Sequence, residues 1–281
     1  MGINKLKKNI KFRDMKRFVL SVFAILTVAV TAAFAEDDRI EKAYHLRGFT
    51  SLRFEVSSEV EIVRSDEYSV TVSVGEEYIP YVSVELDSKS GLLTIDYEKL
   101  PFKLKNSKDR LLHVRISMPY LDALQLSGAS SVKTDTVFTT STAMAGFILD
   151  VSGASKVETL KVNASKAEID ISGSSKVNVS GEFGEIKAEV SGASKFVVKG
   201  SADLLDAEIS GASKFDSEAL TAAEVSISTS GASSSKIYVG RKLTVSASGA
   251  SKCTYIAPGD ISIDVKGISG ASSFKHKSIS E

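Results

Sequence analysis

The side chains that could carry out chemistry are few, and they are scattered along the chain. There are three histidines, His45, His113 and His276, and no two of them are close in sequence. A metal site, or a nucleophile with its base, requires several ligating or proton-accepting side chains in one place. The chain contains no HExxH, GxSxG or phosphate-binding loop motif that would mark such a place. We therefore expect no catalytic residue, no metal site and no cofactor, and we expect that the protein is not an enzyme.

The single cysteine, Cys253, stands at a repeat position that is valine or phenylalanine in most other repeats. A chain with one cysteine has no internal partner for a disulfide. A buried free cysteine behaves as a small apolar residue. We therefore interpret Cys253 as part of the core.

Charged residues recur at fixed positions around a repeated glycine, with lysine three residues after it and an acidic residue three residues before it. If the repeats stack, these residues form two columns on the surface. One interpretation is that the lysines form a candidate binding surface for polysaccharide or for cell-wall or surface material. The alternative is that both columns are solvated charges that keep the protein soluble and discourage wrong strand pairing. The lysine column is Lys156, Lys176, Lys195, Lys214 and Lys252, and the acidic column is Asp150, Asp170, Glu189 and Glu208.

The element that must position these columns is the tetrapeptide Ser-Gly-Ala-Ser, or a near copy of it. It recurs about every 19–20 residues, and a motif with one period is typical of a repeat architecture. Glycine suits a sharp bend because it adopts positive φ at little steric cost, and small neighbours fit into a corner. The copies begin at Ser127, Ser152, Ser172, Ser191, Ser210, Ser230, Ser248 and Ser269.

Apolar residues lie at even distances from each glycine, as at Ala188, Val190 and Phe196 around Gly192, with polar residues between them. This alternation with a period of two predicts half-buried strands on both sides of the turn. One such unit cannot bury its apolar face alone, whereas stacked units can. We therefore predict an all-β fold, a single-stranded right-handed parallel β-helix. In the copy at Ser230 the next apolar residue is Ile237, six past the glycine, which we interpret as a two-residue insertion that preserves the alternation.

The first part of the chain divides into two segments. Residues 1–35 combine basic residues, an apolar run and Ala33-Phe34-Ala35, which predicts a signal peptide and hence export to the periplasm, the outer-membrane surface or the extracellular space. Met15 is an alternative start. We predict one β-helix domain over residues 36–281, with irregular rungs over 36–120 and regular rungs over 121–281. A separate small β domain at 36–120 is the alternative.

The charge of the chain argues against one class of partner. The whole chain carries equal numbers of basic and acidic residues, and removal of the basic leader leaves a mildly acidic protein. Nucleic-acid binding requires a basic stripe or excess, so we expect no nucleic-acid partner. We also expect no stable membrane span once the signal peptide is cleaved.

Several features together resemble a known family. These are the leader, the segments Phe49-x-x-Leu52-x-Phe54-x-Val56 and Gly91-Leu92-Leu93-x-Ile95, and the repeated Ser-Gly turns. Over roughly residues 48–256 the chain resembles the putative auto-transporter adhesin, head GIN domain family, a domain of unknown function common in the Bacteroidetes. The resemblance implies a right-handed parallel β-helix without established catalytic residues. The family's commoner turn is Ser-Gly-Ser-Gly, and the departure at this position bears on the geometry of the turn.

These observations predict an exported, non-catalytic protein of the cell envelope with an adhesin-like, structural or binding role. The alternative is a β-helix enzyme that acts on polysaccharide, either a lyase or a hydrolase. Such enzymes form a cleft from long loops between rungs, and the even spacing of the repeats leaves little room for them. Six of the eight tyrosines lie in the irregular first part, where we expect any more specific site: Tyr44, Tyr68, Tyr78, Tyr81, Tyr97 and Tyr120.

Overall fold

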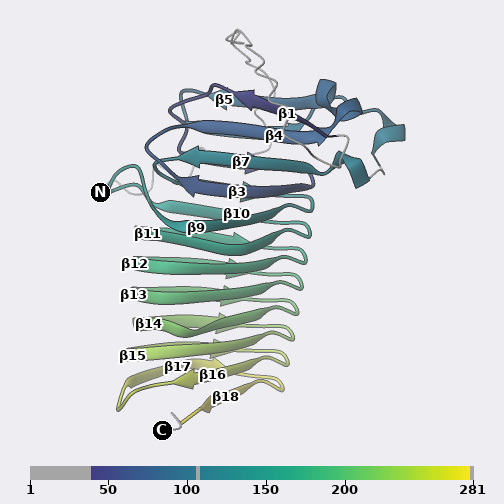
Figure 1. Cartoon of the computed structure of the whole chain (residues 1–281). Helices are drawn as coiled ribbons and strands as arrows, with labels where there is room; N and C mark the ends of the chain where they lie inside the picture. The colour runs from purple at the N-terminus through teal and green to yellow at the C-terminus, as the bar shows by residue number, and fades with distance from the viewer. Residues whose placement is uncertain (1–38, 106–107, 279–281) are drawn as a thin grey trace.

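The computed structural model describes residues 39–105 and 108–278, and the predicted signal peptide at 1–35 lies outside them. The chain forms a parallel β-solenoid of about seven turns, which confirms the predicted fold class. The rungs follow one another along a single axis, and the first strands of the chain lie at one end of the stack (Figure 1). Within the described residues no helix is long and apolar enough to span a membrane.

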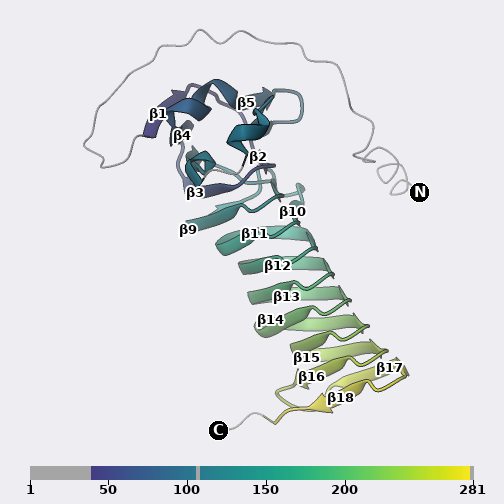
Figure 2. The ribbon, with the colours of Figure 1, turned by 90° about the vertical axis from the view of Figure 1, so that its right-hand side faces the viewer.

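In the middle of the regular part, β11 to β15 are long strands that each run from one SGAS turn to the next, and on either side of them two shorter strands lie between successive turns. Neighbouring strands are parallel and in register, so that Val177 lies opposite Phe196 and Phe196 lies opposite Phe215. Each rung curves round to form two sheets that face each other across the core (Figure 2). The strands of this part are β8 (Ala123–Leu126), β9 (Ser131–Thr139), β10 (Phe147–Val151), β11 (Lys156–Ile171), β12 (Lys176–Val190), β13 (Lys195–Ile209), β14 (Lys214–Thr229), β15 (Ser234–Ala247), β16 (Lys252–Ile256), β17 (Ser262–Ile268) and β18 (Ser273–His276).

The SGAS glycines form a column of their own at one edge of the rungs. Each has a φ between 68° and 75°, the left-handed region that L-residues with a side chain rarely adopt. The column is also tightly stacked, because a Cβ atom added at Gly192 would lie 2.3 Å from the carbonyl oxygen of Gly173. The amide of Ala193 donates a 2.8 Å hydrogen bond to the same oxygen. Both the bend and the contact between rungs therefore require glycine at this position.

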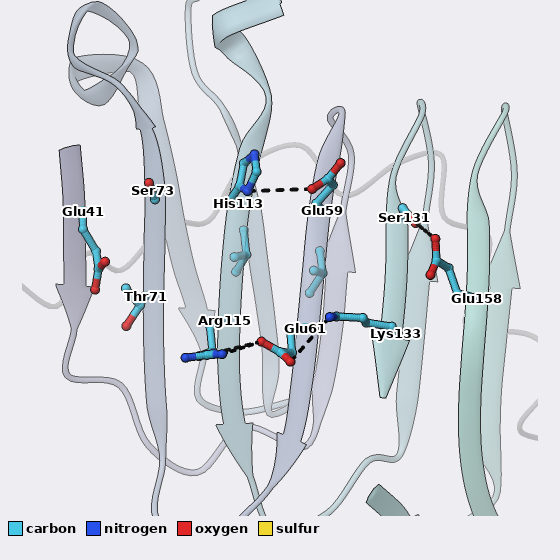
Figure 3. A pocket seen from close by; sticks show the side chains of 12 residues that line it. Glu41, Glu59, Glu61, Thr71, Ser73, His113, Arg115, Ser131, Lys133 and Glu158 are labelled. Carbon is cyan, nitrogen blue, oxygen red and sulfur yellow. Dashed lines mark hydrogen bonds and ion pairs between the residues drawn. The ribbon is translucent and has the colours of Figure 1, made fainter. Parts of the chain in front are cut away.

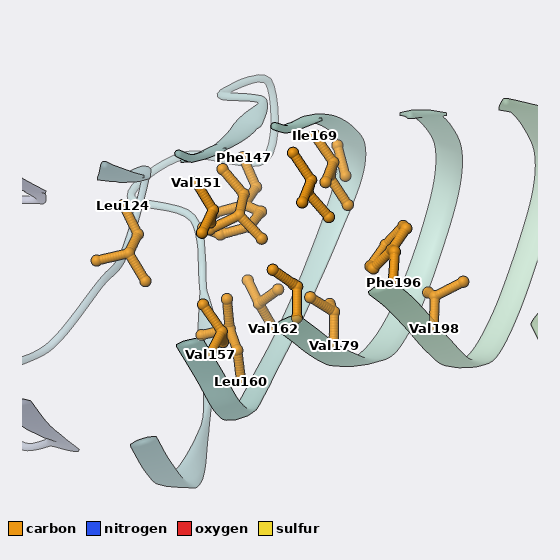
Figure 4. Close-up of a cluster of buried hydrophobic side chains, with 14 of the residues drawn as sticks. Leu124, Phe147, Val151, Val157, Leu160, Val162, Ile169, Val179, Phe196 and Val198 are labelled. Carbon is orange, nitrogen blue, oxygen red and sulfur yellow. The ribbon is translucent and has the colours of Figure 1, made fainter. Parts of the chain in front are cut away.

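The core between the two sheets consists of apolar columns that run along the solenoid. Val157, Val162 and Ile169 of one rung project into the same interior, and their neighbours repeat this arrangement in the next rung (Figure 4). The last serine of every turn except the one at Ser269 also points inward and is buried, as at Ser194 and Ser213. A small side chain fits there because the chain turns sharply at that corner. The period-two alternation of the sequence therefore corresponds directly to burial.

Two positions correct the alignment of the repeats. The register runs from Phe215 through Ser235 to Cys253, so the rung at Ser230 contains no insertion, and Ser235 itself is buried in the phenylalanine column. Our interpretation of a two-residue insertion before Ile237 is wrong, although Ile237 does face inward. In the last rung Val265 lies opposite Val245, and an irregularity follows it, so Lys266 does not occupy the apolar column that counting from the glycine gives it.

The first part of the chain forms rungs that are not stacked in the order of the sequence. Strands β2 and β3 lie between the rung of β6 and β7 on one side and the rung of β8 and β9 on the other, and all of these pairs are parallel. The first rung in the chain is therefore enclosed by later ones. The strands of this part are β1 (Arg39–Tyr44), β2 (Ser51–Phe54), β3 (Ser58–Arg64), β4 (Ser69–Gly75), β5 (Val82–Asp87), β6 (Leu92–Tyr97) and β7 (Leu112–Met118).

The end of the solenoid beyond β6 and β7 is covered by antiparallel strands and short 3-10 helices. β5 pairs with β6, β4 pairs with β7, and β1 pairs with β4, all antiparallel. Three 3-10 helices lie near them, at Glu76–Tyr81, Phe102–Leu104 and Lys108–Arg110. The ring of Tyr78 from the first of these is fully buried. The division of the β-helix domain at residue 120 stays a prediction.

Candidate functional site

The lysine column exists as a geometric feature of the surface. Each of its members is the first residue of a strand, directly after an SGAS turn, and each is exposed. Lys156 lies opposite Lys176, Lys176 opposite Lys195, and Lys195 opposite Lys214. Ser234 then interrupts the column before Lys252. Adjacent strands are about 4.8 Å apart, so the column presents positive charges at nearly the same interval.

The lysines differ in how they are paired. The ammonium of Lys156 lies 2.6 Å from a carboxylate oxygen of Glu158 in the same strand. Over residues 39–105 and 108–278, no carboxylate lies within 4 Å of the ammonium groups of Lys176, Lys195 or Lys214. Three adjacent rungs therefore carry positive charge that no ion pair of the described chain neutralises. Such a row raises the local concentration of anions near the surface.

A second feature is a hollow on the outer face of the first rungs. It has a volume of about 610 Å³ and crosses strands β1, β4, β7, β3 and β9, with Glu158 of β11 at its edge (Figure 3). Most of its lining consists of the outward, polar side chains of these strands, and the buried side chains of Val60 and Val114 also border it. The residues are Glu41, Glu59, Val60, Glu61, Thr71, Ser73, His113, Val114, Arg115, Ser131, Lys133 and Glu158.

Several charged groups of this hollow are paired with one another. The guanidinium of Arg115 lies 2.8 Å from a carboxylate oxygen of Glu61, and the ammonium of Lys133 lies 3.7 Å from the other oxygen. Hydrogen bonds from Arg115 lower the pKa of the Glu61 carboxyl below its ordinary value. His113 Nδ1 lies 3.7 Å from a Glu59 carboxylate oxygen. A carboxyl group that acts as a general acid at neutral pH needs a raised pKa. The lowered pKa of Glu61 favours the ionised carboxylate, which cannot donate a proton.

The structure separates the histidines and buries the cysteine. His113 lies in the hollow on β7, His45 follows β1, and His276 lies in β18 with its ring 4.9 Å from the ring of Tyr255. Among the described residues no group of three or more His, Cys, Asp or Glu side chains could hold a metal ion. Cys253 is fully buried, and burial raises the pKa of its thiol, as suits a core residue rather than a nucleophile.

Four of the six tyrosines of the first part belong to the core or pack against it, whereas Tyr120 is exposed. Tyr78 is fully buried, and the hydroxyl of Tyr97 donates a 2.6 Å hydrogen bond to the carbonyl of Arg110. Tyr68 packs edge-on against the buried ring of Phe49, with 4.8 Å between ring centroids. Burial raises the pKa of Tyr44 to about 12. These rings therefore hold the end of the solenoid together and do not line the hollow.

The charged residues of the hollow were not identified from the sequence. The alternation of strands does indicate that Glu59, Glu61, His113 and Arg115 face outward. What it cannot indicate is that residue 61 lies beside residue 115, because β3 and β7 become neighbours only through the out-of-order stacking of the first rungs.

Several solved structures have a similar fold. A putative adhesin from Parabacteroides merdae superposes with a TM-score of 0.72 at 15% identity, covering 86% of this chain and 97% of that one. A putative adhesin from Parabacteroides distasonis gives a TM-score of 0.70 at 17% identity, covering 86% and 98%. A putative lipid binding protein from the same species gives 0.68 at 15% identity, again covering 86% and 98%. At these identities the likeness shows the fold.

The comparison of sequences points to a family rather than to a characterised protein. No curated protein matches the chain significantly. The family and the similar structures are described as adhesins or lipid-binding proteins, and none of these descriptions is that of an enzyme. Residues 48–257 match one family over most of the solenoid, and the chain therefore belongs to the family described as putative auto-transporter adhesin, head GIN domain.

Proposed function

We propose that this protein is an exported, non-catalytic binding protein of the cell envelope whose lysine column holds an anionic polymer of a cell surface or wall. The observation that carries the proposal is the in-register row of Lys176, Lys195 and Lys214, which has no ion-pair partner within the described residues. The family description as an adhesin supports a binding role. The basic leader with its apolar run and Ala33-Phe34-Ala35 supports export.

The mode of binding follows from the geometry of the column. Exposed charge pairs contribute about 0–1 kcal/mol each, so a single lysine binds an anionic group weakly. A polymer with repeated anionic groups can contact several rungs at once, and linked contacts strengthen one another by raising the effective concentration. Binding should weaken with salt, because exposed charges are screened beyond about 8–10 Å at physiological ionic strength.

The test measures binding of the purified protein to an anionic polysaccharide, polygalacturonate, by isothermal titration calorimetry at low and at physiological salt. Serine is the replacement for Lys156, Lys176, Lys195 and Lys214, because Ser234 already occupies this column in a folded rung. The quadruple variant should lose binding and keep its melting temperature. The matched control replaces four exposed lysines elsewhere by serine and removes the same charge: Lys89, Lys103, Lys242 and Lys275.

Two results would contradict the proposal. One is a quadruple variant that binds as well as the parent, or that loses no more binding than the control variant does. The lysine column would then serve only to keep the protein soluble. Release of oligosaccharides from a panel of polysaccharides would instead show that the protein is an enzyme.

A further inference from the structure

Two columns of opposite charge run along the outer surface of the regular rungs. The strand halves that follow each SGAS turn carry the lysine column, and the halves that precede the next turn carry the acidic column. Asp150 lies opposite Asp170, Asp170 opposite Glu189, and Glu189 opposite Glu208, all in register. Because each rung curves round the core, the strand halves before and after a turn lie on different faces of the solenoid (Figure 2).

The acidic column borders a hollow that the sequence did not predict. It has a volume of about 320 Å³, and we name it the acidic groove. Its long side is formed by Asp170, Glu189 and Glu208 on three successive rungs, and its other side by the first serines of the adjacent turns, such as Ser191. The serine side chains are short, so the groove leaves room beside each carboxylate for a side chain from outside.

The negative charge of the groove is poorly compensated by the protein itself. In the described part of the chain no basic group lies within 4 Å of the carboxylates of Asp170 or Glu208, and Glu189 contacts only Lys187, at 2.9 Å. Burial raises the pKa of the Asp170 carboxyl, and the neighbouring carboxylates of Asp150 and Glu189 raise it further. Stacked acidic groups of this kind favour a partner that brings positive charges at the same spacing.

We propose that the acidic groove binds the lysine column of a second copy of this protein. Lys176, Lys195 and Lys214 of one copy would lie along Asp170, Glu189 and Glu208 of the other. The lysines and the carboxylates belong to the same rungs, β12 to β14 with the end of β11, so both rows repeat at the strand spacing of about 4.8 Å. Two solenoids side by side with aligned axes therefore match charge to charge over three rungs.

The contact joins two different surfaces, and this determines the form of the assembly. After one contact each copy still has one free lysine column or one free acidic groove. Such a heterologous contact continues into open-ended rows unless a rotation closes it into a ring. The contact also competes with the anionic polymer of the proposed function for the same lysines, so polymer should release the copies from one another.

The experiment is sedimentation velocity of the purified protein over a range of concentrations, at ionic strengths of about 0.01 M and about 0.15 M. The wild-type protein should form species larger than a monomer at low salt, and these should dissociate at the higher salt. The combined substitutions Asp170→Asn, Glu189→Gln and Glu208→Gln should weaken self-association by at least about tenfold, since truncating charge pairs at an interface chiefly increases dissociation. A matched control, Glu67→Gln with Glu182→Gln and Asp203→Asn, removes the same charge from exposed sites outside the groove and should associate like the wild type.

A charge exchange makes the test specific for this pair of surfaces. One variant replaces Asp170, Glu189 and Glu208 by lysine, and the other replaces Lys176, Lys195 and Lys214 by glutamate. In each variant alone, the column and the groove carry charge of the same sign, so the variant should stay monomeric. An equal mixture of the two variants should associate. A wild-type protein that stays monomeric at low salt, a neutralised groove that associates like its control, or a mixture of reversed variants that stays separate would each overturn the proposal.

The same variants distinguish this proposal from the proposed function. Neutralising the groove leaves the lysine column intact, so that variant should still bind polygalacturonate while it no longer self-associates. Loss of polymer binding in the lysine variant alone would support the proposed function and say nothing against the groove. Association that persists in the groove variant would remove the groove proposal and leave polymer binding unaffected.

Discussion

The ring of Phe196 lies against the ring of Phe215 in the next rung, with 5.5 Å between the ring centroids and 34° between the ring planes. The parallel register places these residues opposite each other, and both are buried. The pair is an example of how the solenoid is stabilised. Each rung buries its apolar side chains mainly against the side chains at the equivalent positions of the adjacent rungs. Loss of one member should therefore affect two interfaces between rungs.

Truncation of a side chain in this phenylalanine column should lower the stability of the protein. Phe196→Ala should lower the free energy of unfolding by about 3–5 kcal/mol, because a large ring leaves a cavity that the close-packed rungs cannot fill. The neighbouring residue provides the control, since Lys195 points outward and Lys195→Ala should change stability by less than about 0.5 kcal/mol. Urea denaturation followed by circular dichroism measures both. Equal losses at the two positions would show that the inward and outward faces are assigned wrongly.

The glycine column makes a second prediction, which separates the cost of backbone strain from the cost of steric overlap between rungs. Gly48 has a φ of 80° and open space around it, whereas Gly192 has a φ of 73° and the carbonyl of Gly173 in the place of a Cβ atom. Gly48→Ala should cost only the backbone strain of about 1–2 kcal/mol. Gly192→Ala adds the steric overlap between rungs, and its total cost should exceed about 4 kcal/mol, which is rare for a single substitution. Thermal or urea unfolding measures the loss of stability in each variant. A similar loss in Gly48→Ala and Gly192→Ala would mean that the rungs can move apart at the turn.

The regular rungs could be predicted from the sequence because each carries the same local signals. A glycine with positive φ, a small inward serine and apolar residues at even offsets recur in every unit, so burial follows from counting residues from the turn. Counting fails where a rung is irregular. The irregularity after Val265 shifts Lys266 out of the column that its number suggests. At Ser235 counting gives the correct core position, and it was the polar side chain that suggested an insertion which the structure does not have.

The first rungs could not be predicted in the same way. Alternation indicates which side chains face outward, but it does not indicate which strand is the neighbour. Arg53 donates a 2.7 Å hydrogen bond to the side chain of Gln125, 72 residues later, because β2 lies beside β8. The hollow around Glu61 and Arg115 depends on the same out-of-order stacking. The lysine column was predicted, by contrast, because its members belong to consecutive repeats.

The predicted leader makes a third prediction, which concerns export. The apolar run that ends in Ala33-Phe34-Ala35 should be cleaved after Ala35, because small residues at these two positions suit the signal peptidase. N-terminal sequencing of the exported protein should begin at Glu36. Replacing Ala33 and Ala35 by bulky residues should leave the leader attached, whereas replacing Phe34 should not. An exported protein that retains residues 15–35 would contradict the signal-peptide interpretation.

The acidic column makes a fourth prediction, which concerns pH. Burial is the largest cause that raises the pKa of the Asp170 carboxyl, the carboxylates of Asp150, Glu189 and Glu168 add to it, and Lys187 opposes it. A raised pKa means that the folded state holds the proton more tightly than the unfolded state does. The stability that this group contributes is therefore present below its unfolded pKa of about 3.9 and is lost as the pH rises through the higher folded value.

Asp170→Asn should accordingly raise the free energy of unfolding at pH 7. The gain should be below about 1 kcal/mol, because the carboxyl is partly exposed and solvent screens its neighbours. At a pH of about 3 the carboxyl is protonated in the folded state and largely so in the unfolded one, so the gain should disappear. Urea denaturation at the two pH values, at a protein concentration where only monomer is present, measures the difference. Asp203→Asn, at an exposed site outside the column, is the control and should show no such gain at pH 7. An Asp170→Asn variant that is less stable than the parent at pH 7, or equally stabilised at both pH values, would show that burial of the Asp170 carboxylate and repulsion from its neighbours do not lower the stability of the solenoid.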